Sequence, residues 1–103
     1  MAKAVIFSGA CGFSTNVETT KEGKQVKISI QSECDAIQRL AEALQEVEPF
    51  REISHRRETP LTLQMGAQYC THAACPVPVG IIKAVEVEAG LALPVDASIK
   101  LFN

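Results

Sequence analysis

The chain has 103 residues and a mass of 11.1 kDa, which is the size of one small domain, and its formal net charge is −2. Hydrophobic residues make up 47% and charged residues 21%, so disorder and collagen-like structure are excluded. Ten Lys and Arg against twelve Asp and Glu argue against a nucleic-acid binder, which would show a basic excess. No apolar run approaches the ~20 residues of a membrane span, and the first residues are not a signal peptide. We therefore expect a cytoplasmic protein with no membrane contact, folded as one domain over residues 1–103.

The first third of the sequence predicts three strands. Ala4–Phe7 is a short apolar run followed by a loop with two glycines. Phe13–Thr20 is rich in Ser, Thr and Val, which suits an exposed strand or an edge strand. Gln25–Gln31 alternates between apolar and polar residues, the period of a half-buried strand. A turn signal at Lys21–Lys24 joins the last two strands into a predicted hairpin.

The rest of the sequence predicts three helices and a final strand. An apolar stripe at helical spacing covers Ser32–Glu48, which opens with a serine cap and is followed by a proline. Thr59–Tyr69 begins with a cap and a proline, which predicts a second helix. A third helix is expected over Pro78–Gly90, although Val85–Glu88 alternates with period two and places two glutamates against the helix dipole. Ala97–Phe102 is the expected last strand.

This order of elements predicts the fold class. Three strands, three helices and a last strand indicate an α+β fold, with about three helices covering one face of a small, mostly antiparallel sheet of about four strands.

Four cysteines restrict the chemistry that the protein can perform. In a cytoplasmic chain they favour a metal site, catalysis or buried thiols over structural disulfides. Cys11 lies in the loop after the first strand and Cys34 in the first turn of a helix, while Cys70 and Cys75 flank His72. Loops and helix N-termini favour the thiolate, which is the form that binds metal and attacks sulfur.

These residues could form a zinc site or hold an iron–sulfur cluster. Cys70 and Cys75 would be ligands, completed by Cys34, Cys11 or His72. The alternative is that the cysteines pack as small hydrophobic residues and His72 is a polar loop residue. A catalytic Cys75–His72 pair has no evident third orienting group, so enzymatic activity stays an open question.

The segment Cys75-Pro-Val-Pro78, followed by Val79–Lys83, resembles the Cys-Pro-x-Pro helix start of TusA-like sulfur carriers. The likeness covers Cys75–Leu101, about a quarter of the chain. It implies that Cys75 carries a persulfide and passes sulfur to a partner protein. In that family the motif follows the first strand, whereas here it follows three predicted strands and two helices.

The cysteine positions also resemble those of iron–sulfur scaffolds of the IscU/NifU type, which have one cysteine after an early strand, one at a helix start and one before a late helix. The resemblance implies that Cys11, Cys34 and Cys75 (or Cys70) take these places. The chain as a whole resembles an uncharacterised family of short cysteine-bearing proteins from anaerobic prokaryotes, a resemblance that implies no established activity.

Three functional hypotheses follow from the sequence. The first is a small metal- or iron–sulfur-binding protein, the second a persulfide carrier that uses Cys75, and the third an interaction module in which the predicted edge strand Phe13–Thr20 pairs with its copy in a homodimer. Geometry separates the first two, because a shared metal site needs Cys75 near Cys34 or Cys11, whereas a carrier needs Cys75 alone and exposed. We expect Cys34 and Cys75 at helix N-termini at the same end of the helical layer.

Overall fold

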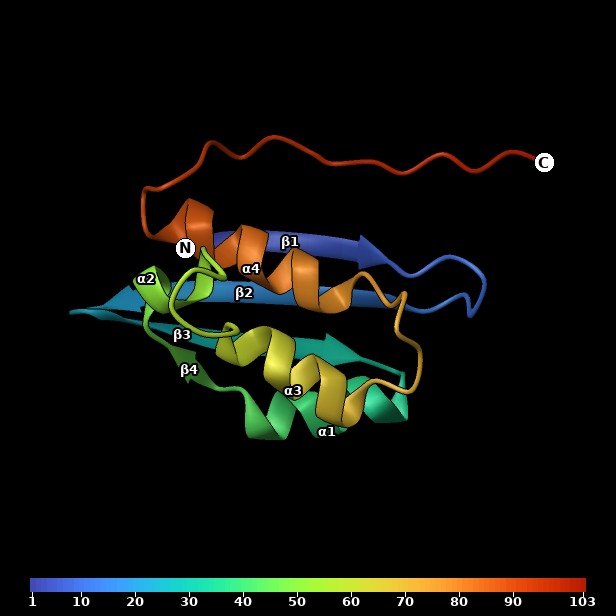
Figure 1. The fold of residues 1–103 in the computed structure, drawn as a ribbon, viewed down its shortest axis with the longest axis horizontal. Helices are drawn as coiled ribbons and strands as arrows, with labels where there is room; N and C mark the ends of the chain where they lie inside the picture. The colour runs from blue at the N-terminus through green and yellow to red at the C-terminus, as the bar shows by residue number, and fades with distance from the viewer.

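The computed structural model describes residues 1–103 as a four-stranded antiparallel sheet with helices packed on one face (Figure 1). The strands lie in chain order across the sheet: β1 (Ala2–Phe7), β2 (Ser14–Glu22), β3 (Gln25–Ser32) and β4 (Glu46–Val47). The helices are α1 (Asp35–Ala43), α2 (Pro49–Glu52), α3 (Leu61–Tyr69) and α4 (Val77–Glu88). The predicted α+β class is confirmed.

The expected hairpin is formed by β2 and β3, which pair from Thr15 opposite Ser32 to Glu22 opposite Gln25. Gly23 closes the turn with φ +62°, a left-handed conformation that glycine adopts without strain. β2 also pairs with β1 along its other side. The prediction that Phe13–Thr20 is an edge strand is therefore wrong, and the edges are β1 and β4. The side chains of β2 that face the helices include fully buried threonines, so the polar composition of this segment did not indicate exposure.

The first helix is shorter than its apolar stripe suggests. It ends at Ala43, and the following residues extend the sheet, with Val47 opposite Val26 in β3. The backbone N–H of Ile28 donates to the carbonyl of Gln45 over 2.9 Å. Leu44 and Val47 are buried as the stripe requires, but they reach the core from outside the helix. The backbone groups of residues 44–47 find hydrogen-bond partners in β3, as they would in a longer helix. Because Leu44 and Val47 are buried in either case, the apolar periodicity could not place the end of the helix.

A distant carboxylate caps the second predicted helix. Glu52, which is only 2% exposed, accepts hydrogen bonds from the backbone N–H groups of Leu61 at 3.0 Å and Thr62 at 2.9 Å, and from the Thr62 hydroxyl. A negative charge at this position satisfies free N–H groups and suits the positive end of the helix dipole. The capping role that the sequence assigned to the start of Thr59–Tyr69 therefore belongs to Glu52.

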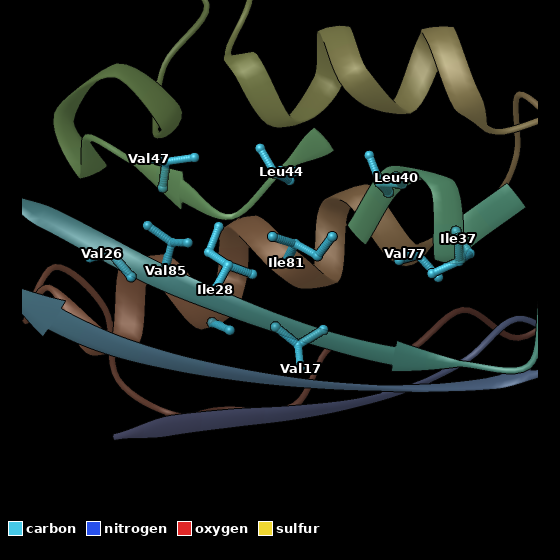
Figure 2. Close-up of a cluster of buried hydrophobic side chains, with 11 residues drawn as sticks. Val17, Val26, Ile28, Ile37, Leu40, Leu44, Val47, Val77, Ile81 and Val85 are labelled. Carbon is cyan, nitrogen blue, oxygen red and sulfur yellow. The ribbon is translucent and has the colours of Figure 1, made fainter. Parts of the chain in front are cut away.

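The core lies between the sheet and the helices. Figure 2 shows side chains from α1 and α4 facing those of β2 and β3. Its fully buried members include Val17, Val26, Leu40, Leu44, Val77, Ile81 and Val85. This layer fixes α1 and α4 against the same face of the sheet and thereby fixes where each of them begins.

The predicted last strand Ala97–Phe102 is not formed. α4 ends at Glu88; Gly90, two residues on, has φ +76°, and the N–H of Leu91 donates back to the carbonyl of Glu86 over 2.9 Å. Residues 90–103 are all exposed, and their course runs past the end of β1 in Figure 1. The alternation of residues 97–102 describes a segment able to form a strand, but no strand of this sheet pairs with it. None of the helices has the length and apolar character that crossing a membrane would require.

Candidate thiol site

Three helix termini meet at one end of the sheet, and each delivers a cysteine. α1 and α4 begin at this end, and α3 ends there (Figure 1). Cys34 is the N-cap residue of α1, Cys70 is the C-cap residue of α3, and Cys75 immediately precedes Pro76, the N-cap of α4. Cys34 and Cys75 thus lie at helix starts at the same end of the fold, as expected.

Local hydrogen bonds explain why α1 begins at Cys34. The Ser32 hydroxyl accepts from the backbone N–H of Cys34 at 3.2 Å and so turns the chain out of β3. The side-chain amide of Gln38 donates to the Ser32 carbonyl at 2.8 Å, and the Gln38 N–H donates to the Cys34 carbonyl at 2.9 Å. Ser32 therefore shapes the approach to the helix, and Cys34, one turn before Gln38, occupies the cap position.

Close packing of α3 against α4 sets the position of the other two thiols. A Cβ atom on Gly66 would lie 2.7 Å from Cγ of Pro78, so only glycine permits this helix crossing. Gly66 also accepts the backbone N–H of Cys70 at 2.9 Å, which ends α3. The chain then returns through a turn in which the N–H of Cys75 donates to the carbonyl of His72 at 3.2 Å.

The three thiols are half-buried and influence one another. Cys34, Cys70 and Cys75 pack against the edge of the hydrophobic core. The pKa of the Cys70 thiol is raised to about 11, above all by burial and, to a lesser degree, by its interactions with Cys75 and the charge of Cys34. Cys70 therefore lies near Cys75, and Cys34 is close enough for its charge to act on Cys70.

The remaining predicted site residues are not part of this group. Cys11 is exposed in the loop between β1 and β2, which lies at the same end of the sheet, and His72 is exposed between Cys70 and Cys75. Neither affects the pKa of Cys70. All four cysteines are free thiols. As the side chains are packed, no three His, Cys, Asp or Glu residues are arranged to hold a metal ion.

Sequence reasoning did not identify two residues next to this group. Gly66 holds α3 close to α4, and a glycine inside a helix was the available signal. Thr15 is fully buried, and its hydroxyl has no hydrogen-bond partner. It pairs with Ser32, two residues before Cys34, so it lies at the end of the sheet where α1 begins.

No curated protein and no solved structure matches the chain. One family does match, over residues 2–101, and its description is a family of unknown function, DUF6951. Since this match spans the sheet, all four helices and all four cysteines, the chain belongs to the DUF6951 family.

Proposed function

We propose that the protein binds either a zinc ion or an iron–sulfur cluster through Cys34, Cys70 and Cys75. The observation that supports this function is the grouping of three half-buried thiols from separate parts of the sequence, with Cys70 influenced by both others. A persulfide carrier would need Cys75 alone and exposed, whereas Cys75 is half-buried beside Cys70. The arrangement therefore favours the metal hypothesis over the carrier hypothesis.

The chemistry of the donor set fits a soft cation. Neighbouring negative charge contributes to the raised pKa of Cys70, and a bound cation would reverse that contribution. The N-termini of α1 and α4 place partial positive charge beside Cys34 and Cys75, on the side of the molecule where an anionic ligand set would form. Because no three ligands converge in the present packing, loading requires the thiols to move toward one another. A bound zinc ion would link the three helix ends, and a cluster would supply a redox centre.

Three thiolates leave room for a further ligand. His72 is the candidate, since it is exposed and lies between Cys70 and Cys75 in the chain. Four free thiols also suit a reducing compartment, so we place the protein in the cytoplasm.

Sulfur transfer is the second candidate function, because Cys75 directly precedes the start of α4 and lies near a second thiol, Cys70. In this step the Cys75 thiolate attacks the outer sulfur of a persulfide on a sulfur-trafficking partner protein. A new S–S bond forms on Cys75, the S–S bond of the donor breaks, and the donor cysteine leaves as a thiolate that takes up a proton.

The test is metal binding by the full chain, purified without oxygen and stripped with a chelator. Co²⁺ serves as the probe, because thiolate ligation gives it intense absorption bands. We expect Cys70→Ser to weaken binding by more than the roughly 10–100-fold that loss of an outer-shell partner costs. The matched control is Cys11→Ser, which removes an exposed thiol outside the group.

Two outcomes would contradict the metal proposal. One is a chain that takes up neither Co²⁺ nor a reconstituted iron–sulfur cluster. The other is Co²⁺ affinity unchanged by Cys34→Ser, Cys70→Ser and Cys75→Ser. Mass spectrometry after incubation with a cysteine desulfurase and cysteine tests the second candidate: an adduct of about 32 Da, the mass of one sulfur atom, that is lost in Cys75→Ser would favour the carrier.

A further inference from the structure

The segment after α4 has a strong strand pattern but no partner in the sheet. From Val95 to Leu101 every odd-numbered residue is apolar and every even-numbered residue is polar or charged. These side chains are among the most exposed of the molecule, with Ile99 at 81% and Leu101 at 88%. Beyond Val95 the chain makes no backbone hydrogen bond. Strict alternation of this kind is the pattern of a strand with one buried face, so the apolar face of this tail, residues 95–102, lacks the cover that its sequence requires.

The sheet has a free edge of matching length. β1 is bonded to β2 on one side only, so alternate N–H and C=O groups of Ala2–Phe7 point outward without ladder partners. Six residues form this edge, and six residues form the segment Ala97–Phe102. Val5 and Phe7 project from β1 on the face away from the helices and are 78% and 63% exposed. An exposed apolar edge strand of this kind is a template for another strand.

We propose that the tail of one chain pairs as an added strand with β1 of a second copy, and that the exchange is reciprocal. Each chain contains both the free edge and the unpaired strand, so one two-fold axis satisfies both tails and both edges in a closed dimer. Pairing places tail side chains beside Val5 and Phe7 and removes apolar surface from water.

The separation of the tail from its own sheet favours a second copy over the chain's own β1. The tail leaves the end of α4, runs apart from the helices and the sheet, and continues past the end of β1 (Figure 1). Only two charged side chains, Asp96 and Lys100, lie between Val95 and Asn103, and both are at even positions, opposite the apolar face. Burying that face therefore removes no charged side chain from water.

The test uses the full chain with reduced thiols and a chelator, so that metal bridges do not contribute. We expect light scattering to give twice the chain mass of 11.1 kDa. Hydrogen exchange should show slow amides both in β1 and in the tail. Ile99→Glu should convert the dimer to a monomer, while Ser98→Glu, the same charge on the opposite face, should leave it dimeric. Because Ile99 is exposed in the single chain, Ile99→Glu should leave the circular dichroism of the rest of the fold unchanged.

Several results would overturn this assignment. A monomer with rapidly exchanging tail amides would mean that the tail has no partner. A monomer with slow tail amides would show that the tail pairs with its own chain. A dimer whose tail exchanges rapidly, or one that resists Ile99→Glu as well as Ser98→Glu, would place the interface elsewhere. None of these results depends on whether the thiols bind metal.

Discussion

Glu88 lies in the last turn of α4, where a negative charge opposes the helix dipole. Its carboxylate accepts the backbone N–H of Ala2 at 2.6 Å and that of Lys21 at 2.9 Å, and it lies 3.4 Å from the N-terminal ammonium group. The hydrogen bond from Lys21, followed by those from Ala2 and the N-terminus, holds the pKa of Glu88 below its ordinary value despite partial burial. One side chain thus joins the end of α4 to β1 and β2.

We expect Glu88→Gln to lower the free energy of unfolding at neutral pH by about 1 kcal/mol, because the hydrogen bonds to a charged acceptor are partly exposed. The folded pKa of Glu88 lies below the unfolded value of 4.5, so its contribution to stability is present above pH 4.5 and is lost as the pH falls through the folded pKa. Urea unfolding between pH 3 and pH 7 should therefore show less acid sensitivity in Glu88→Gln than in the wild type. Glu86→Gln is the matched control. Identical pH profiles for Glu88→Gln and the wild type would refute this role.

At the scale of elements, the contact between α3 and α4 decides where two of the thiols lie. A methyl group on Gly66 would meet the ring of Pro78, which is rigid, at 2.7 Å and 3.2 Å. The two helices can approach this closely only because Gly66 of α3, which faces the ring of Pro78 in α4, has no side chain. Cys70 ends the first of these helices and Cys75 precedes the second, so the separation of the helix axes also sets the separation of the thiols.

Gly66→Ala tests this crossing through the sign of its effect. In an unconstrained helix, alanine would stabilise the protein by about 1 kcal/mol relative to glycine. Because the added methyl group must displace α3 or α4, we expect a loss of about 1–3 kcal/mol in the free energy of unfolding. Gln68→Ala, at an exposed position of the same helix, should have little effect. A gain of stability in Gly66→Ala would show that the helices have room to separate without cost.

The helices and the hairpin could be predicted because their signals are local. Proline before α3 and glycine after α4 mark ends that depend on a few neighbouring residues, and period two identifies β3 directly. The end of α1 could not be predicted, because Leu44 and Val47 fit the helical stripe and are buried in either arrangement. The cap of α3 was missed for a related reason: Glu52 is a side chain nine residues away from the Leu61 N–H, and no local pattern points to it.

At the scale of the whole molecule, the sequence predicts which segments can be strands better than which strands pair. Ala97–Phe102 has the right alternation, but the fourth position of the sheet is taken by the two residues of β4, and the free edge stays at β1. The arrangement of the cysteines was easier to predict from the sequence. A helix that follows β3 directly must start at the end of that strand, which places Cys34 at the end of the sheet where α4 also begins.

With this arrangement, the proposed metal binding would belong to the folded state alone, which leads to a prediction for the stability of the whole molecule. Cys34 is far from Cys70 and Cys75 in sequence, and only the folded layer of α1, α3 and α4 brings their thiols together. A ligand that binds the native state at 100 times its Kd adds about 2.7 kcal/mol to stability, which raises the Tm of a domain of this size by roughly 10–20 °C. We expect a shift of this size when zinc is added to the reduced, metal-free protein at neutral pH. The shift should shrink at lower pH, because protons compete with zinc for the thiolates. Cys70→Ser should abolish most of it and Cys11→Ser should retain it, whereas equal shifts in both variants would mean that zinc stabilises the fold through some other site.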